Sequence, residues 1–322
     1  MTCRICGNGA GNQSYEAKEM MFGSGEVFRY FQCARCGCLQ IGEFPPDLSR
    51  YYPEDYYSYQ PGPPAGRIKA RLIGLRNRYA VWSRGLLGRL LYAKRPNPVL
   101  RCLWRLRLGT DARILDVGCG SGAGLRSLQE LGFRNLLGID PLNRQDLEHP
   151  GGLKVLKRTI HELEGQWDLV MFHHSFEHVP DPAETLLSAS RLLSPAGHCV
   201  IRTPTVSSDA WEHYRAEWVQ LDAPRHLHLH SVESLGLLAG KAGLDPYQVV
   251  CDSTAFQFWG SEQYRKGIPL RDPRSGATSL PGALFSRAEL AGFARRAEQL
   301  NAAGRGDQAI FYLRKSGERR PG

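Results

Sequence analysis

The stretch ILDVGCGSGAG, residues 114–124, decides the fold. It starts with an apolar run typical of a buried strand and ends where a helix is expected to begin, and Gly118, Gly120 and Gly122 lie between the two. Glycines let the backbone approach a ligand closely, and the N-terminus of the following helix offers N–H donors to it. The stretch therefore predicts a nucleotide-binding turn between a strand and a helix.

Two acidic residues strengthen this prediction, because a glycine motif alone would be weak evidence. Asp116 precedes Gly118 by two positions, at the end of the first strand. Asp140 closes the second strand, NLLGID, where an acid can accept hydrogen bonds from both hydroxyls of a ribose. The strand ends therefore favour a bound nucleoside.

Strand and helix patterns alternate along the rest of the chain, and no internal repeat is present. Such alternation predicts a mostly parallel sheet with helices on both faces, an α/β fold. The stretch 261–306 gives no clear pattern. We expect strands at 113–118, 135–140, 167–174, 198–205, 246–253 and 307–315, and helices at 121–132, 181–194 and about 231–242.

Residues 111–315 resemble the class I S-adenosylmethionine-dependent methyltransferases, through the pattern DxGxGxG that begins at Asp116 and through Asp140. The resemblance implies a Rossmann-like, doubly wound sheet of seven strands in the order 3-2-1-4-5-7-6, with the last strand antiparallel. A dinucleotide oxidoreductase is disfavoured, because its fingerprint is G-x-G-x-x-G and normally begins near an N-terminus.

The same resemblance implies a site for the cofactor S-adenosylmethionine. Residues of the glycine turn would line its methionine and ribose portions, and residues after the third strand would touch adenine, although the usual acid is not evident there. The cofactor-binding residues predicted in this way are Asp116, Gly118, Cys119, Gly120, Gly122, Asp140, Pro141, Thr159, Ile160, His173 and His174.

The decapeptide HHSFEHVPDP, residues 173–182, looks at first like a metal site. It follows a predicted strand, however, and ligands of open α/β sheets bind at the carboxyl ends of strands. Asp181 and Pro182 predict the N-cap and first turn of a helix, and the HExxH spacing of a helical metal site is absent. We therefore predict that Glu177 and His178 lie on a loop between cofactor and acceptor rather than on a metal ion.

The stretch WVQLDAPRHLHLHS, residues 218–231, follows the fifth strand, where the family inserts acceptor-binding segments. A similar Asp-x-Pro-Arg-His occurs in a subset of zinc-ribbon-bearing methyltransferases associated with sugar, glycan or natural-product methylation. The resemblance implies O- or N-methylation of a sugar, nucleotide sugar or lipid-linked glycan. C-methylation is disfavoured, because sugar C-methyltransferases that begin this way usually carry a further C-terminal domain.

Methyl transfer from a sulfonium is an in-line displacement, so positioning dominates, and a neutral hydroxyl acceptor also needs a base. We predict His226 as this base and His178 as a second catalytic residue. Arg225 would bind an anionic group, and Tyr214 and Glu177 would help to shape the acceptor pocket.

The histidines of the same stretch leave alternatives open. His226, His228 and His230 alternate and would share one face of an extended segment. They could form a metal triad, or they could simply belong to a polar loop that leads into a helix cap at Ser231.

The first fifty residues contain two CxxC pairs, Cys3–Cys6 and Cys33–Cys36, separated by 26 residues. This is the spacing of a structural four-cysteine Zn²⁺ site, in which no coordination position stays open. Coincidence and a redox dithiol are the alternatives. Cys38 has no predicted role.

Twelve Lys or Arg and no acidic residue lie between Asp55 and Asp111, in a chain whose net charge is +9. After an aromatic and proline-rich linker at 51–66, apolar residues recur every three or four positions from Ile68 to Leu90, as on one helix face. This basic helix either packs on the catalytic domain with a solvated face or contacts an anionic membrane or a phosphorylated substrate.

The domain boundaries that we predict are 1–50 for the zinc-binding module, 51–110 for the linker and basic segment, 111–316 for the methyltransferase domain and 317–322 for a disordered tail. No membrane span or signal peptide is evident, so we expect a cytoplasmic protein. If the basic helix contacts an anionic membrane, the protein would lie at the inner face of that membrane. Two other functions stay open: an RNA methyltransferase that uses its basic segment and zinc module, and a non-catalytic membrane-associated adaptor.

Overall fold

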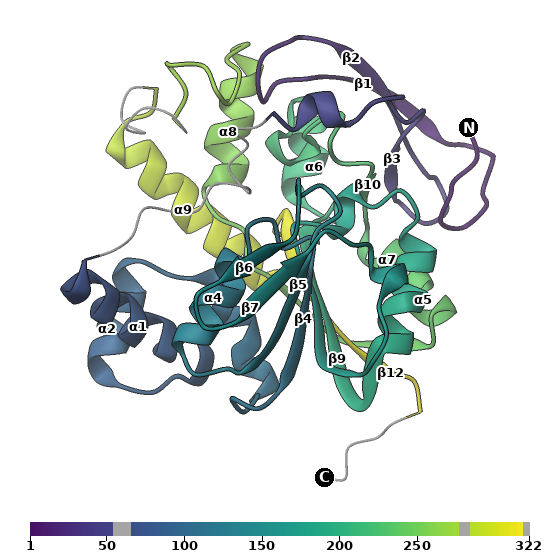
Figure 1. Ribbon diagram of the computed structural model, residues 1–322. Helices are drawn as coiled ribbons and strands as arrows, with labels where there is room; N and C mark the ends of the chain where they lie inside the picture. Colours follow the sequence, from purple (N-terminus) through teal and green to yellow (C-terminus); the bar gives the residue numbers. More distant parts are fainter. Residues whose placement is uncertain (54–65, 277–283, 318–322) are drawn as a thin grey trace.

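The computed structural model describes residues 1–53, 66–276 and 284–317. The predicted linker at 51–66 and the predicted tail at 317–322 fall largely outside these ranges. Within them the chain forms one sheet of eight strands and one of four strands, with helices around both (Figure 1).

The larger sheet has the strand order β11-β12-β9-β8-β4-β5-β7-β6. Without β6, and with the other strands counted along the chain, this is the predicted order 3-2-1-4-5-7-6. β12 runs antiparallel to both of its neighbours, and the predicted α/β fold is confirmed. The strands are β4 (Arg113–Val117), β5 (Asn135–Ile139), β6 (Leu147–His149), β7 (Leu153–Leu156), β8 (Trp167–His173), β9 (Leu193–Pro204), β11 (Leu244–Cys251) and β12 (Gln308–Lys315).

The hairpin of β6 and β7 was not placed by the sequence patterns. Its turn contains Gly151 and Gly152, both with positive φ, which glycine adopts without the steric strain of other residues. A Cβ at Gly151 would also overlap the side chain of Gln129, which lies in the helix after the glycine turn. The hairpin adds an antiparallel edge strand beyond the seven expected ones.

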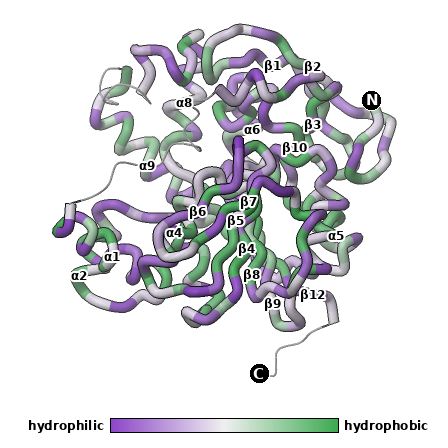
Figure 2. The backbone as a smooth tube through the Cα atoms, viewed as in Figure 1, coloured by the Kyte–Doolittle hydropathy of each residue, from purple (hydrophilic) through white to green (hydrophobic). Residues whose placement is uncertain are grey.

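Successive strand residues pack into two different cores, one on each face of the sheet. Ile114 belongs to one core and Leu115 to the other, and Met171 and Val170 divide in the same way. The central strands appear largely hydrophobic in Figure 2. α5 (Pro182–Leu192) and α7 (Val232–Lys241) cover one face, and α1 (Arg67–Trp82), α3 (Pro98–Arg101) and α4 (Ala123–Glu130) cover the other.

Residues 67–94 of the basic segment form two helices, so the single continuous helical face predicted there is wrong. α1 ends at Trp82, and α2 (Leu86–Lys94) starts after Ser83 and Gly85, which both have positive φ. At Gly88 the two helices approach so closely that a Cβ would lie 2.6 Å from a backbone carbonyl oxygen of α1. The chain therefore folds back on itself as a helical hairpin.

The smaller sheet joins the N-terminus to a distant part of the chain. It contains β1 (Gln13–Lys18), β2 (Val27–Gln32), β3 (Leu39–Ile41) and β10 (His228–Leu229), in this order. β10 pairs antiparallel with β3, so the sheet crosses the boundary predicted at residue 50. The N-terminal module is thereby held against the loop that follows β9 (Figure 1).

Three further helices lie in the loop before β10 and in or next to the stretch without a predicted element. They are α6 (Asp209–Tyr214), α8 (Phe256–Arg265) and α9 (Arg287–Ala302). Their apolar residues form a third core, with Trp211 and Phe258 packed near Tyr30 of the smaller sheet. Among the described residues, no helix has the length and apolar character needed to cross a bilayer.

Candidate active site

The glycine turn between β4 and α4 has the conformation that its sequence predicts. Gly118, Gly120 and Gly122 have φ values of 73°, 55° and 74°, a region that other residues rarely adopt. A Cβ at Gly118 would overlap the side chain of Ser175, whose hydroxyl donates a 2.6 Å hydrogen bond to the Val117 carbonyl. The turn thus keeps bare backbone at the carboxyl edge of the sheet.

The two acids predicted at this edge are both buried. Asp140 accepts hydrogen bonds from the backbone N–H groups of Gly120, at 2.8 Å, and Leu142, at 2.9 Å. Asp116 Oδ1 has no hydrogen-bond partner among the described residues. Burial and the neighbouring charge of Asp140 raise the pKa of Asp116 to about 7.

A cavity of about 500 Å³, here called the strand-edge cavity, opens beside the turn. Six of the predicted cofactor-binding residues line it: Gly118, Asp140, Pro141, Thr159, Ile160 and His174. Its other lining residues include Leu48, Tyr52, Phe172, His178 and Asp181. This cavity therefore brings together the end of β4, the end of β5 and the decapeptide loop.

The remaining predicted cofactor residues do not line this cavity. Asp116, Gly120 and Gly122 lie in the strand end and turn behind it. The side chains of Cys119 and His173 also lie outside its lining: Cys119 Sγ packs against Gly138, and His173 Nε2 lies 3.7 Å from Cys102 Sγ. β8 ends at His173, and His174, with a φ of 49°, already belongs to the loop, so the two side chains have different surroundings.

A second cavity of about 380 Å³, here called the histidine cavity, adjoins the first. His174 and His178 line both cavities, so the two meet at the decapeptide loop. The residues that line the histidine cavity are Met21, His174, His178, Val219, Gln220, Asp222, His226, Phe256, Leu270 and Arg271.

His226 reaches this cavity as a neutral imidazole. Its Nδ1 lies 2.8 Å from the Gln220 carbonyl oxygen, so Nδ1 carries the proton and donates it to that oxygen. Burial lowers the pKa of His226 to about 4, well below neutral pH. Nε2, which then holds a lone pair, lies 3.8 Å from Asp222 Oδ2 and 3.9 Å from Glu177 Oε1.

Glu177 is a fully buried carboxylate behind these histidines. Burial acts to raise its pKa, but the interactions with His174, His226 and His178 outweigh burial and hold the pKa well below the ordinary value. Thr203 Oγ1 donates a 2.9 Å hydrogen bond to Glu177 Oε2, while Oε1 lies 3.3 Å from His174 Nδ1. Glu177 is therefore ionised at neutral pH.

One potential ligand atom each from Glu177, His178 and His226 lies within 4.8 Å of the others, which is the geometry of a group that can hold a metal ion. The sequence argument against a metal in the decapeptide used only its internal spacing, and it missed the contribution of His226 from another loop. The three alternating histidines of that loop, in contrast, do not form a metal group in the described part of the chain.

His228 and His230 are buried away from His226. Their rings lie 6.0 Å apart and nearly parallel. His228 Nδ1 is 3.1 Å from the Val179 carbonyl oxygen, and His230 Nδ1 is 3.3 Å from Ser234 Oγ. Both side chains are thus buried and line neither of the two cavities.

Arg225 and Tyr214 do not lie where the sequence placed them, because neither lines one of the two cavities. Arg225 is fully buried, with its guanidinium 2.7 Å from Asp222 and 2.8 Å from Glu19. The Tyr214 hydroxyl donates a 2.9 Å hydrogen bond to Glu262. Internal partners occupy both polar groups, so neither is available to an acceptor.

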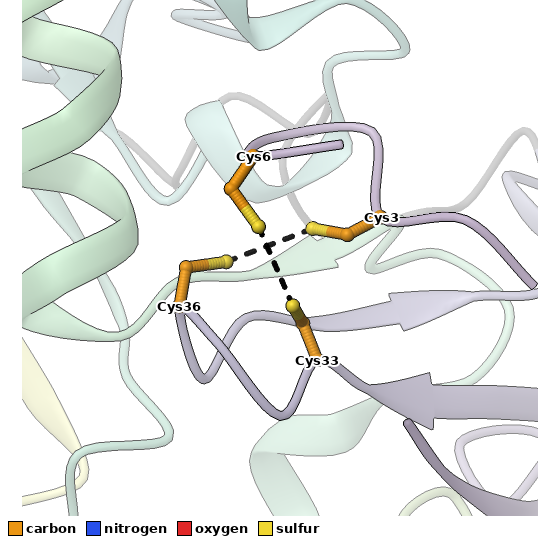
Figure 3. A group of neighbouring side chains, drawn as sticks. All are labelled: Cys3, Cys6, Cys33 and Cys36. Carbon is orange, nitrogen blue, oxygen red and sulfur yellow. Dashed lines mark hydrogen bonds between the residues drawn. The ribbon is translucent and has the colours of Figure 1, made fainter. Parts of the chain in front are cut away.

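The four predicted cysteine ligands converge at the N-terminus (Figure 3). Cys3 and Cys36 Sγ lie 3.6 Å apart, and Cys6 and Cys33 Sγ lie 3.5 Å apart. A tetrahedral Zn²⁺ with bonds of about 2.3 Å holds its sulfurs about 3.8 Å apart, so the cluster fits the ion. The Gln40 side chain donates a 2.9 Å hydrogen bond to Cys3 Sγ, which supports a thiolate.

Several lining residues carried no sequence signal. Met21 comes from the N-terminal module, and Leu270 and Arg271 come from the stretch that had no predicted element. Backbone hydrogen bonds from Leu270 N to Met20 O, at 2.7 Å, and from Arg271 N to Met21 O, at 2.8 Å, hold these segments together. The histidine cavity is therefore built from parts about 250 residues apart in the chain.

The family described as "Methyltransferase domain" matches residues 87–249, just over half of the chain. The chain belongs to the methyltransferase domain family. This confirms the predicted class of S-adenosylmethionine-dependent methyltransferases, and the matched region of the methyltransferase domain contains the glycine turn, the decapeptide loop and His226.

Curated relatives of this methyltransferase domain include two bacterial proteins named "Ubiquinone biosynthesis O-methyltransferase". The protein of Acinetobacter baylyi is 34% identical over 28% of this chain and 43% of its own length. That of Pseudomonas aeruginosa is 30% identical over 43% of this chain and 66% of its own length. The chain thus spans less than two thirds of the length of these relatives.

Among solved structures, the cyclopropane synthase MmaA2 of Mycobacterium tuberculosis matches 65% of this chain and 80% of its own chain, with 17% identity and a TM-score of 0.42.

Proposed function

We propose that this methyltransferase transfers the methyl group of S-adenosylmethionine to a hydroxyl group of a small-molecule or glycan acceptor. The observation that carries the proposal is the junction of the strand-edge and histidine cavities at His174 and His178. A donor in the first cavity and an acceptor in the second would meet there, as an in-line displacement requires.

The strand-edge cavity is the proposed cofactor site. The bare backbone at Gly118 allows close approach of a ligand, and the Asp140 carboxylate is fixed by two backbone N–H groups so that its remaining lone pairs can accept from ribose hydroxyls. Thr159, Ile160 and His161 line the part of the cavity assigned to adenine. The bound cofactor supplies an electrophilic methyl group on sulfur.

His226 and His178 are the residues proposed to act on the acceptor. A hydroxyl must lose its proton as its oxygen attacks the methyl carbon, and a positioned neutral imidazole assists that loss. His226 is neutral and directs Nε2 toward the other polar groups at the cavity. The buried carboxylate of Glu177, 3.9 Å from His226 Nε2, stays ionised and places a negative charge beside both histidines.

Oxygen is the proposed methylated atom, with nitrogen as the second choice. The relatives named as O-methyltransferases support oxygen. A sugar, nucleotide sugar or lipid-linked glycan is the proposed acceptor class, on the strength of the DAPRH motif at 222–226 and the N-terminal cysteine pairs.

Incubation of the purified chain with methyl-labelled S-adenosylmethionine and separate panels of nucleotide sugars, lipid-linked glycans, phenols and RNA tests this function. We expect label in a hydroxyl-bearing small molecule or glycan. His226→Asn should reduce transfer at least about 100-fold while calorimetry still detects the cofactor, and His213→Asn, at an exposed histidine outside both cavities, should leave transfer unchanged.

Other outcomes of this screen would replace the proposal. Label in RNA with a steep dependence on salt would identify an RNA methyltransferase that uses the basic segment. Absence of cofactor binding would leave only a non-catalytic adaptor.

We also propose a structural Zn²⁺ at Cys3, Cys6, Cys33 and Cys36, supported by the sulfur distances and by the hydrogen bond from Gln40. Metal analysis of the purified chain should give one Zn²⁺ at this cluster. Replacement by Co²⁺ should produce the intense thiolate charge-transfer absorption of a four-sulfur site.

Peripheral contact with anionic membrane through residues 67–107 is a separate proposal. Leu86, Ile68 and Leu90 are 81%, 78% and 63% exposed, next to arginines on both helices of the hairpin. The wild type should co-sediment with phosphatidylglycerol vesicles but not with phosphatidylcholine vesicles. Leu86→Ser with Leu90→Ser should abolish binding, whereas Leu187→Ser, at an exposed leucine of α5, should not.

A further inference from the structure

We infer that Glu177, His178 and His226 bind one divalent transition-metal cation in the histidine cavity. This inference rests on the proposed function, because it gives the cation the task of binding the acceptor oxygen. The starting observation is the convergence of one potential ligand atom from each residue within 4.8 Å. The three residues come from the decapeptide loop and from the loop before β10, on two sides of the same junction.

Neighbouring groups orient these ligands as they do in metalloenzymes. The Gln220 carbonyl fixes the proton of His226 on Nδ1, at 2.8 Å, which leaves Nε2 as a metal ligand. The Arg225 carbonyl oxygen lies 2.9 Å from His178 Nδ1 and fixes that ring in the same way. Thr203 donates to Glu177 Oε2 and leaves Oε1 for the cation.

The second and independent observation is the state of Glu177 Oε1. This oxygen belongs to a side chain with no exposed surface, and no described residue donates a hydrogen bond of acceptable geometry to it, although His174 Nδ1 lies 3.3 Å away. A buried carboxylate oxygen without a well-aligned donor destabilises the fold unless a cation satisfies it. His226 Nε2, 3.9 Å away, faces the same point without donating a proton to it. A cation between the two would satisfy both lone pairs.

The ligand set determines the class of ion. Two imidazoles and one carboxylate favour Mn²⁺, Fe²⁺, Co²⁺ or Zn²⁺ over Mg²⁺ or Ca²⁺, which prefer oxygen ligands alone. Three protein ligands leave coordination positions open for an acceptor. Asp222 is not counted as a ligand, because Arg225 occupies its carboxylate at 2.7 Å.

Such a cation gives the acceptor hydroxyl a lower pKa, because it stabilises the negative charge on oxygen. In the transfer the hydroxyl proton leaves to water, the oxygen lone pair forms the new bond to the methyl carbon, and the electron pair of the broken carbon–sulfur bond stays on sulfur. The metal keeps its oxidation state, so no further reactant is needed. With the cation bound, His226 serves as a ligand and water takes the proton, which revises the role of base proposed for His226 above and leaves the proposed transfer to a hydroxyl unchanged.

Mn²⁺ is the probe that separates this site from the four-cysteine cluster, because Mn²⁺ prefers nitrogen and oxygen ligands to thiolates. Titration of the chain that carries one equivalent of Zn²⁺, which the four thiolates bind first, followed by electron paramagnetic resonance, should show one bound Mn²⁺ per chain. Glu177→Gln and His226→Gln should each weaken this binding at least about tenfold. Glu217→Gln and His213→Gln, at exposed residues outside both cavities, should leave it unchanged.

Calorimetry with S-adenosylmethionine shows whether each variant is folded, and His178→Gln, at a half-buried loop residue, replaces any variant that is not. Wild type without Mn²⁺ binding, or variants that bind Mn²⁺ as the wild type does, would overturn the inference. Methyl transfer that survives full chelation would then leave the proposed function intact. Mn²⁺ bound at these residues with no transfer to any hydroxyl would contradict the function and not the metal site.

Discussion

Asp116 and Asp140 hold two carboxyl groups in one buried volume at the edge of the larger sheet. The sequence predicted both positions, because each acid ends a strand next to the glycine turn. It did not predict that backbone N–H groups would occupy Asp140 while Asp116 Oδ1 stays without a partner. Burial raises the pKa of both acids: that of Asp116 reaches about 7, whereas the backbone hydrogen bonds of Asp140 oppose the rise there.

The raised pKa of Asp116 predicts a pH effect on the free protein. An acid with a raised folded pKa stabilises the protein only below that pKa, so stability should fall as pH rises from about 4 to 7. In the Asp116→Asn variant, the decrease in the free energy of unfolding over this pH range should be smaller by about 1–3 kcal/mol. Urea unfolding at pH 5 and pH 7.5 measures it, with Asp111→Asn, at an exposed acid, as the control. Equal pH dependence in the wild type and Asp116→Asn would contradict the assignment.

At Arg225 the sequence motif at 222–226 and the structure differ on the role of the side chain. The sequence placed it on an anionic acceptor, whereas it neutralises the buried Glu19 and the nearby Asp222. Nothing in the local pattern indicates that Glu19, more than two hundred residues away, is its partner.

The structure therefore predicts a stability defect rather than a binding defect at Arg225. Arg225→Ala leaves a buried carboxylate unpaired and should lower the free energy of unfolding by about 3–5 kcal/mol. Arg296→Ala, which breaks an exposed pair with Asp209, should cost about 1 kcal/mol or less. Denaturant unfolding of both variants tests this, and similar losses in the two would refute it.

At the scale of single elements, the sequence predicted six of the eight strands of the larger sheet, most of them to within a few residues, since apolar runs between turn signals define them. The basic segment was harder, because its apolar spacing continues across the break at Ser83–Gly85 and periodicity alone does not reveal a reversal. The hairpin of β6 and β7 is too short for a clear pattern, and α8 and α9 lie in a stretch rich in polar residues.

Two glycines of the helical hairpin should respond in opposite directions to the same substitution. Gly88→Ala puts a methyl group against a backbone carbonyl of α1 and should destabilise the protein by about 1–3 kcal/mol. Gly74→Ala meets no atom within 4 Å and should stabilise it by about 0.5–1 kcal/mol. Thermal or urea unfolding gives both signs, and stabilisation by Gly88→Ala would show that the helices do not cross there.

At the scale of the whole molecule, the site depends on contacts that no local pattern encodes. Glu177 and His226 lie 49 positions apart, and sequence motifs predict both as site residues. Only the fold, however, brings Glu177 Oε1 and His226 Nε2 to a distance of 3.9 Å. Tyr30 of β2 donates a 2.9 Å hydrogen bond to the His226 carbonyl oxygen, across a sequence separation that hides the pair from motif analysis.

The N-terminal module should therefore affect the whole chain when its cysteines change. Cys36→Ser should lower the melting temperature by about 5–10 °C, as expected for a loss of about 3 kcal/mol. Cys251→Ser, at a half-buried cysteine outside the cluster, should change it much less. Calorimetric melting with parallel Zn²⁺ analysis checks this, and an unchanged melting temperature in a zinc-free variant would refute a structural ion.

The pairing of β10 with β3 has a consequence for engineering and for divergence within such proteins. An N-terminal module that supplies a sheet neighbour to the segment before α7 cannot be exchanged as an independent unit. A chimaera that carries a foreign module would need the matching 218–231 loop to restore the pairing. The N-terminal module and the 218–231 loop should therefore change together during evolution, although they lie far apart in the sequence.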